Sequence, residues 1–328
     1  MGDQQIIADS IQVLSLPMRY RFRSVSEREL ILFQGSRRWA EWSPFIEYPD
    51  AVAARWLRAA LEWANSDLPP ALRTRIPINA TLPAAGTAEL RELLASFSGS
   101  KTVKLKVGGE SSWHEDLARI ELISRELPEA RLRLDANGSW SVAEAIRAVS
   151  KVLEIGVALD YLEQPVAGIS ELVELRTELA ALGLPVPIAI DESLRNAPGD
   201  AALLGELRPE VVILKAAPIG GIASALELQS AFPGSRFVVS SALESSIGLQ
   251  AGLHLAAALD TAPEDCGLGT SLLFENDVVS SPLRPNGGWI ELPAEPLEPE
   301  PALTAGLKAP VARRDWWLAR LERCLALL

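Results

Sequence analysis

Five charged side chains recur along the sequence at nearly even intervals. They are Lys106, Asp135, Glu163, Asp191 and Lys215, and successive members are 24 to 29 residues apart. Each ends or follows a short run of apolar residues, which predicts that each lies at the C-terminal end of a strand. A barrel of about 250 residues with eight strand–helix units has about 31 residues per unit, so the five residues occupy the same position in successive units.

This order of charges indicates a particular chemistry. Three neighbouring carboxylates repel one another and their pKa values rise, whereas a hard divalent cation bound by their oxygens removes that cost. We therefore predict a Mg²⁺ site at Asp135, Glu163 and Asp191, in which Mn²⁺ could substitute. A lysine on either side, its pKa lowered by neighbouring positive charge, could remove a proton next to a carboxylate while the cation stabilises the enediolate.

Any one of these residues, taken alone, could have a purely structural role. A lone lysine or aspartate at a strand end is more often part of a structural salt bridge than a catalytic group. Five such residues in phase with the repeat of a barrel favour a shared site instead, because barrel active sites are built at the C-terminal ends of the strands.

The elements that position these residues form a regular series. Strands are predicted at 76–80, 102–107, 130–137, 157–165, 187–193, 211–218 and 236–241, with a weaker run at 265–270. Helical stretches rich in Ala, Leu and Glu separate them. Apolar strands that alternate with helices predict a buried parallel sheet, and eight predict a modified (β/α)8 barrel. The first strand lacks a G-x-G-x-x-G turn, which argues against an open dinucleotide-binding sheet.

The two ends of the chain differ in character from this repeat. Residues 1–75 predict short strands and an amphipathic helix, and we expect them to form an α+β capping domain beside a barrel at 76–285. Residues 286–328 comprise a Pro- and Glu-rich connector and a final amphipathic helix, which we expect to pack back on the capping domain. The Arg-rich stretch 19–26 fits either a lid or a solvated strand edge. We expect Phe45 to pack within the small domain rather than line a pocket.

Composition excludes several classes of function. Hydrophobic residues make up 48% of the chain and charged residues 23%, as in ordinary soluble enzymes. The net charge of −12 argues against nucleic acid or an anionic membrane as a partner. Two histidines exclude a His-rich zinc site, and two cysteines make no disulfide framework. No signal peptide or membrane span is recognisable, so we expect a cytoplasmic enzyme of a small-molecule carboxylate, with no obligate protein partner evident.

The motifs around the five charges resemble those of the enolase superfamily. They are KLKVGG with Lys104 and Lys106, RLRLDANGSW with Asp135, DYLEQP with Glu163, IAIDESL with Asp191, and ILKAAPIGG with Lys215. A lysine on each side of the carboxylates is similar to the muconate-lactonising-enzyme subgroup, and the resemblance covers nearly the whole chain. It implies that Lys106 is the general base and acid and that Lys215 stabilises an enediolate beside Mg²⁺.

The resemblance also implies a surrounding set of residues. Lys104, Asn137, Ser240 and the backbone at Gly267 are expected to bind the substrate, and Glu192 is expected in the second layer around the metal. The small-domain loop reads RRWAEW where a glycine-rich turn is usual in the superfamily. This departure leaves the geometry of the capping loop open.

Several stretches resemble one family within that subgroup, the o-succinylbenzoate synthases, in their shorter actinobacterial-like form. These stretches are PMRYRFRSVSERELILFQG, RRWAEWSPFIEY, VVSSALESSIGL and RDWWLARL. The resemblance implies dehydration of 2-succinyl-6-hydroxy-2,4-cyclohexadiene-1-carboxylate (SHCHC) to o-succinylbenzoate, a step of menaquinone biosynthesis. Two alternatives stay open: an N-succinylamino acid racemase or dipeptide epimerase with the same two lysines, and a catalytically inactive barrel with a binding role.

Overall fold

The computed structural model describes residues 5–22, 25–109, 111–184, 186–196, 204 and 207–328. Its centre is a parallel sheet of seven strands, in the spatial order β11-β10-β9-β8-β7-β6-β5. The strands are β5 (Ala80–Leu82), β6 (Thr102–Lys106), β7 (Arg131–Asp135), β8 (Ala158–Glu163), β9 (Ile188–Ile190), β10 (Val211–Leu214) and β11 (Arg236–Val239). Their order follows the chain, as the alternation of strands and helices predicts.

Residues 266–267 close this sheet into a barrel. The amide of Cys266 donates to the carbonyl of Pro77 (2.7 Å), and the amide of Gly267 donates to the carbonyl of Val239 (2.9 Å). Cys266 and Gly267 thus pair in parallel with Ile78 on one side and with Ser240 on the other. The weak strand predicted at 265–270 is this short bridging segment.

The first predicted strand needs a correction. Residues 76–80 do not form one barrel strand. Instead β4 (Arg75–Pro77) pairs antiparallel with β12 (Trp289–Glu291), and β5 is the strand that pairs in parallel with β6. The sequence is apolar through both pieces, so its pattern did not reveal the break between them.

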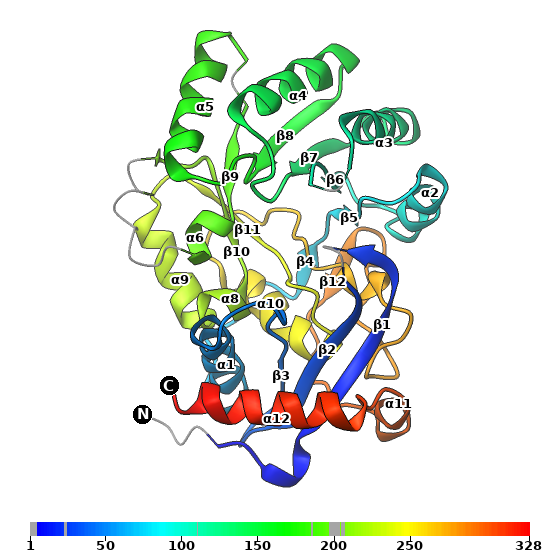
Figure 1. The fold of residues 1–328 in the computed structure, drawn as a ribbon, viewed down its shortest axis with the longest axis vertical. Coiled ribbons are helices and arrows are strands. Elements are labelled where there is room, and N and C mark those ends of the chain that lie inside the picture. The colour runs from blue at the N-terminus through cyan, green and yellow to red at the C-terminus, as the bar shows by residue number, and fades with distance from the viewer. Residues whose placement is uncertain (1–4, 23–24, 110, 185, 197–203, 205–206) are drawn as a thin grey trace.

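Helices surround the sheet (Figure 1). They are α2 (Thr87–Ser96), α3 (Trp113–Glu126), α4 (Val142–Ile155), α5 (Ile169–Ala181), α9 (Ile222–Ala231) and α10 (Ser246–Ala258). Ser112 and Ser141 cap α3 and α4, and each forms a capping box with the glutamate three residues later. Short helices α6 (Glu192–Asn196) and α8 (Ala216–Ile219) begin directly after β9 and β10. They start where the predicted site residues lie.

The small domain is an antiparallel sheet with helices from both chain ends. Strands β1 (Gln12–Phe22), β2 (Val25–Gln34) and β3 (Trp39–Trp42) pair in order, and α1 (Asp50–Asn65) follows them. Helix α12 (Val311–Leu325) lies across this unit, and its Trp317 packs edge-on against Trp42 with ring centroids 5.5 Å apart. Figure 1 shows the blue N-terminal strands and the red C-terminal helix side by side. A short helix, α11 (Pro301–Gly306), interrupts the connector before α12.

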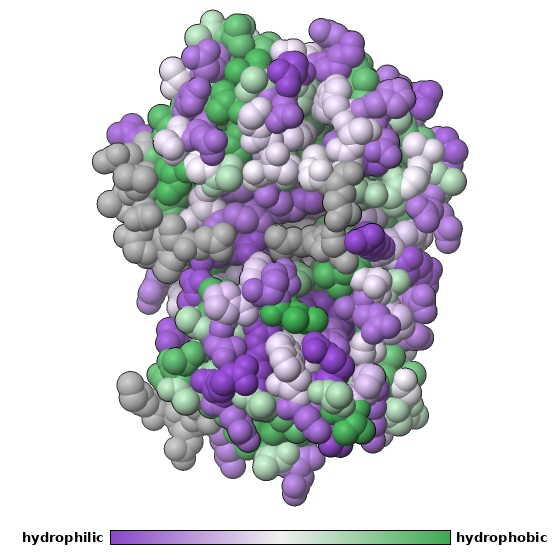
Figure 2. All heavy atoms as spheres, in the orientation of Figure 1, coloured by the Kyte–Doolittle hydropathy of each residue, from purple (hydrophilic) through white to green (hydrophobic). Residues whose placement is uncertain are grey.

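The barrel and the small domain share one apolar core. Buried side chains form a continuous cluster from Leu14 and Trp42 in the small domain to Leu134 and Val239 in the barrel. In Figure 2, hydrophilic residues gather at mid-height of the face shown, where the barrel meets the small domain. Among the described residues, no helix has the length and apolar character needed to span a membrane.

Candidate active site

The ends of neighbouring strands bring the predicted site residues together. Lys106 pairs in register with Asp135 across β6 and β7, and Asp135 pairs with Glu163 across β7 and β8. Asp191 and Lys215 each come directly after the last residue of their strand, β9 and β10. Because parallel strands end on the same side of a barrel, all five side chains belong to one face of it.

Short contacts link these groups. The Nζ of Lys104 lies 2.9 Å from Oδ2 of Asp135 and 2.6 Å from Oε1 of Glu163. The Nζ of Lys106 lies 3.9 Å from Oδ1 of Asp135, and the Nζ of Lys215 lies 2.6 Å from Oδ2 of Asp191. Asp135, Glu163 and Asp191 are buried, so these ion pairs lie largely out of contact with water.

A second layer of polar groups surrounds this cluster. The side-chain amide of Asn137 donates to Oε1 of Glu192 (2.9 Å). Arg195 on α6 pairs through Nε with Oδ1 of Asp191 (3.1 Å) and also bonds Glu192. Its Nη1 donates to the hydroxyl of Tyr48 in the small domain (2.8 Å). Arg195 was not among the residues predicted from the sequence, although it follows Asp191 by four residues, which is the spacing of an ion pair on a helix.

The cluster carries strongly perturbed pKa values. Burial disfavours the charge on Lys104, but Asp135 and Glu163 outweigh it and raise the pKa of Lys104 well above its usual value. Burial would likewise raise the pKa of Asp135 and Asp191, yet their lysine partners hold both below the ordinary range. Glu163 behaves differently, because burial and the neighbouring charge of Asp135 raise its pKa to about 7. Among the three strand-end carboxylates, Glu163 is therefore the one whose charge is poorly compensated.

A pocket opens beside these groups and encloses about 410 Å³ of space, part of which is open solvent. Five of the predicted residues line it: Lys104, Asp135, Asn137, Lys215 and Ser240. Gly267 packs against Ser240, since a Cβ there would lie 2.6 Å from the Ser240 hydroxyl. Lys106, Glu163, Asp191 and Glu192 are not among the described residues that line it.

Other lining residues were not predicted. Thr81, Ser241, Ala242, Leu243 and Thr270 come from strand ends and loops, and Phe22 and Phe45 come from the small domain. Phe45 is buried, as expected, but it also faces the cavity. The stretch 19–26 forms the end of β1 and the start of β2, and its residues 23–24 lie outside the described part of the chain.

Comparison with known proteins identifies the chain. A family model described as "Enolase C-terminal domain-like" matches residues 87–296, and one described as "Enolase N-terminal domain-like" matches residues 13–64. The o-succinylbenzoate synthase of Mycobacterium tuberculosis (strain ATCC 25618 / H37Rv) is 42% identical over 327 residues, which cover 99% of this chain and 96% of that protein. The chain belongs to the o-succinylbenzoate synthase family of the enolase superfamily.

Further relatives agree with this membership. The o-succinylbenzoate synthase of Mycolicibacterium smegmatis is 42% identical over 98% of this chain and 97% of its own length. Among solved structures, muconate lactonizing enzyme from Pseudomonas fluorescens superposes with a TM-score of 0.76 at 22% identity, over 92% of this chain and 98% of that one. N-succinyl Arg/Lys racemase from Bacillus cereus superposes with a TM-score of 0.73 at 19% identity, over 92% and 97%. These structures share the fold, so the modified barrel is confirmed.

Enzymes of the enolase superfamily generally use Mg²⁺. In the described part of the chain, no three His, Cys, Asp or Glu side chains are grouped as a ready metal site. The carboxylates bond lysine ammonium groups instead, so a cation must displace some of these bonds. Oε2 of Glu163 is buried and has no hydrogen-bond partner among the described residues. Three buried carboxylates on adjacent strands, one with an unused oxygen and a raised pKa, fit a hard cation.

Proposed function

We propose that this protein catalyses the Mg²⁺-dependent syn-dehydration of SHCHC to o-succinylbenzoate in menaquinone biosynthesis, as a hydro-lyase. The observation that carries the proposal is the row of Lys106, Asp135, Glu163, Asp191 and Lys215 at neighbouring strand ends beside a pocket. It occurs in a chain that is 42% identical to o-succinylbenzoate synthases over almost its full length. Neither the strand ends nor the identity alone would specify both the chemistry and the substrate.

Proton transfer is assigned to Lys106. Its neutral amine removes the ring proton next to the SHCHC carboxylate and then returns it to the departing hydroxyl, so that water leaves and the ring becomes aromatic. Its Nζ lies 3.9 Å from Asp135, at the end of β6. One lysine serves both steps because the proton and the hydroxyl leave from the same face of the ring.

Lys215 is assigned a different role. It stays an ammonium and stabilises the enediolate from the other side, because a fixed positive charge in a water-poor site lowers the energy of a developing anion. It follows β10, whereas Lys106 ends β6, and the three carboxylate-bearing strands β7, β8 and β9 lie between them in the sheet. The two amines thus flank the position proposed for the substrate carboxylate.

The metal is assigned to Asp135, Glu163 and Asp191. Mg²⁺ bound there, or Mn²⁺ in its place, would neutralise negative charge on the substrate carboxylate as the proton is removed. Arg195 and Glu192 hold the outer side of this group, since Arg195 pairs with Asp191 and Glu192 accepts from Asn137. For the substrate itself we propose Lys104, Asn137, Ser240 and the backbone at Gly267.

The remaining assignments rest on the sequence and its relatives. We propose a capping domain at 1–75, a barrel at 76–285 and a C-terminal segment at 286–328 that completes the capping domain. We also propose a cytoplasmic enzyme of a small carboxylate, without a nucleic-acid, membrane or obligate protein partner. The acidic net charge of −12 supports the exclusion of polyanions.

An ultraviolet assay tests the dehydratase directly. Purified protein is mixed with SHCHC and Mg²⁺, and the aromatic product is followed by its absorbance. We expect turnover that stops when EDTA is added and returns with excess Mg²⁺. Folded protein that leaves SHCHC unchanged in Mg²⁺ would refute the proposed function.

The flanking amines favour one second activity, racemisation or epimerisation of N-succinylamino acids or dipeptides. Such a reaction needs a proton acceptor on one face of a carbon and a donor on the other. Deuterium wash-in at Cα of N-succinylamino acids in heavy water is the test. Deuterium incorporation by the wild-type protein that is lost in Lys215→Arg would establish this second activity. Absence of incorporation by the wild-type protein would leave dehydration as the only proposed activity.

A further inference from the structure

One buried cation of the small domain binds the wall of the active-site cavity. Arg28 on β2 is 2% exposed. Its Nε donates to the carbonyl of Leu243 (3.1 Å), and its Nη2 donates to the carbonyls of Ala242 (3.2 Å) and Ser43. Ala242 and Leu243 belong to the loop after β11, so Arg28 joins the two domains through main-chain carbonyls.

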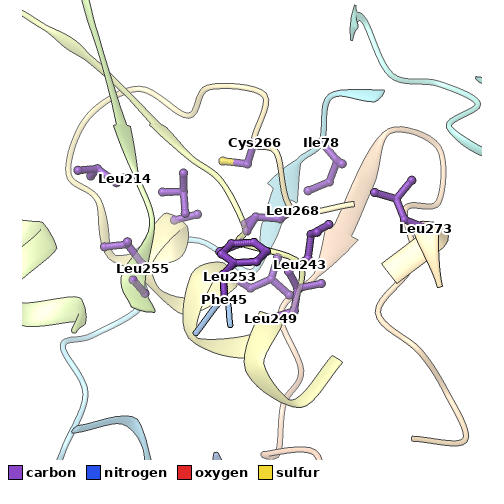
Figure 3. Close-up of a cluster of buried hydrophobic side chains, with 14 of the residues drawn as sticks. Phe45, Ile78, Leu214, Leu243, Leu249, Leu253, Leu255, Cys266, Leu268 and Leu273 are labelled. Carbon is purple, nitrogen blue, oxygen red and sulfur yellow. The ribbon is translucent and has the colours of Figure 1, made fainter. Parts of the chain in front are cut away.

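These contacts lie directly beside the cavity. Ala242, Leu243 and Phe45 line it together with Lys104 and Lys215. The guanidinium carbon of Arg28 lies 4.3 Å from the centre of the Phe45 ring, which fits a cation–π contact. Figure 3 shows the Phe45 ring among Leu243, Leu249 and Leu253 of the barrel. Arg28 therefore contacts the aromatic and the main-chain components of the same wall.

The backbone of this wall is strained. Leu243 has a φ of +65°, a conformation that non-glycine residues rarely adopt and that costs about 1 kcal/mol or more. Such a conformation persists only where neighbouring contacts impose it. The Nε of Arg28 binds the carbonyl of this residue.

Both packing and directed bonds hold the segment. Ala242 and Leu243 are buried in the main apolar core, whereas Ser240 and Ser241 line the active-site pocket and also a second pocket between the domains. Glu41 of β3 binds the segment in addition to Arg28, because its Oε2 accepts hydrogen bonds from the amide (2.9 Å) and the hydroxyl (2.5 Å) of Ser245.

We propose that Arg28 is a positioning residue for substrate binding, which holds the 240–245 wall against the small domain so that the cavity fits its ligand. The proposal rests on the proposed function of the same site. A planar guanidinium can reach three carbonyls in different directions, whereas a single ammonium cannot satisfy them all in the same geometry. Arg28 touches neither the carboxylates nor the lysines of the cluster in any contact above, so its loss should weaken binding more than chemistry.

The test compares Arg28→Met and Arg28→Lys with Arg38→Met as a matched control. Arg38 also donates to two main-chain carbonyls, those of Trp63 (2.7 Å) and Ser66, and its guanidinium lies 5.1 Å from the Trp63 ring. All these partners lie within the small domain. The assay uses SHCHC with Mg²⁺. We expect Arg28→Met to raise KM about tenfold and to change kcat by no more than about threefold. Arg28→Lys should raise KM less, and Arg38→Met should leave KM and kcat unchanged.

Hydrogen exchange of the 241–245 amides supplies a readout independent of activity. We expect faster exchange in both Arg28 variants and unchanged exchange in Arg38→Met. If the wild-type protein does not turn over SHCHC, the proposed function is refuted. The role of Arg28 is then decided by hydrogen exchange and by the Kd of o-succinylbenzoate, each measured for the wild type and the variants. If Arg28→Met does not fold, Arg28→Lys decides it in the same way.

Three results would overturn the proposal. Unchanged KM and exchange in folded Arg28 variants would show that the wall is held without Arg28. A fall in kcat with constant KM would assign Arg28 to the chemical step. Equal effects of Arg28→Met and Arg38→Met would indicate general loss of stability.

Discussion

The two ends of the barrel both carry dense clusters of buried charge, and they are built differently. At the N-terminal end, Arg133 pairs with Asp160 (2.7 Å) and Glu264 (3.3 Å). Arg236 also pairs with Asp160 (2.9 Å), and a third arginine, Arg131, pairs with Asp265 (3.3 Å). At the C-terminal end the cations beside the strand carboxylates are mainly lysines, and a glutamate oxygen lacks a partner among the described residues.

This difference separates a structural cluster from a chemical one. Guanidinium groups keep their charge and bind carboxylates in a fixed geometry, which suits a permanent structural cluster. Amines can lose a proton and move, which suits proton transfer. A small group of buried side chains also lies in the barrel, namely Tyr161, Ala189, Val211, Ile213 and Val238, and the Tyr161 ring lies 4.8 Å from the Arg133 guanidinium. Burial of charge alone therefore does not identify an active site, whereas exchangeable cations and an unsatisfied carboxylate do.

Replacement of the proposed base should have the largest effect on activity. Lys106→Ala removes the only group assigned to proton transfer, so kcat for SHCHC should fall about 10³-fold, or about 4 kcal/mol. Its melting temperature should change little, because the Lys106 side chain is partly exposed to solvent. Steady-state kinetics and thermal unfolding measure both quantities. A Lys106→Ala protein with wild-type kcat would exclude this residue as the base.

The opposite pattern is expected at the N-terminal end. Arg133→Met leaves Asp160 and Glu264 without their buried partner, and the free energy of unfolding should fall by about 3–5 kcal/mol. The folded variant should keep a kcat near the wild-type value, because Arg133 pairs with Asp160 and Glu264 and not with the three carboxylates of the candidate site. Denaturant titration at constant Mg²⁺ checks the first claim. A large fall in kcat at unchanged stability would contradict the division between the two ends.

Lys215→Arg should have an intermediate effect on the dehydratase. The guanidinium keeps the positive charge beside Asp191 but has a different shape, so we expect kcat to fall about 10- to 100-fold, or about 1.4–2.7 kcal/mol. Any racemase activity should disappear, since an arginine does not give up its proton. Parallel assays of SHCHC and an N-succinylamino acid measure the two losses. Equal retention of both activities would mean that Lys215 transfers no proton.

The smallest effect concerns acid stability of the N-terminal cluster. Burial would raise the pKa of Asp160, but Arg133 and Arg236 outweigh it and lower that pKa below its ordinary value. A depressed pKa contributes stability above the unfolded-state value, about 3.9, and that contribution is lost as the pH falls through the folded-state value. Unfolding of Asp160→Asn should therefore depend less steeply on pH below about 4 than unfolding of the wild type. Parallel slopes would show that Asp160 titrates normally.

Most of the fold could be predicted from the sequence, whereas few of the contacts around the pocket could. Strand periodicity placed Lys106, Asp135, Glu163, Asp191 and Lys215 at one end of a barrel, because a regular repeat converts spacing along the chain into position in space. The break between β4 and β5 was invisible, since both pieces are apolar and the pairing with β12 joins residues more than 200 positions apart.

Contacts between the domains were equally hidden from the sequence. Arg28 and Leu243 are distant along the chain, and nothing in the local pattern of β2 marks Arg28 as buried. Tyr48 and Arg195 meet in the same way across the domain boundary. Such pairs depend on how the two domains pack against each other, which residue spacing along the chain does not encode.

The location of a bound metal tests the central claim most directly. Crystals grown with Mn²⁺ and o-succinylbenzoate would be measured at a wavelength where manganese scatters anomalously. We predict one strong anomalous peak, from a manganese ion coordinated by the carboxylates of Asp135, Glu163 and Asp191. At least one of the bonds from Lys104 and Lys215 to these carboxylates should be broken. Protein that turns over SHCHC in Mn²⁺ but shows no peak at these three carboxylates would contradict the account.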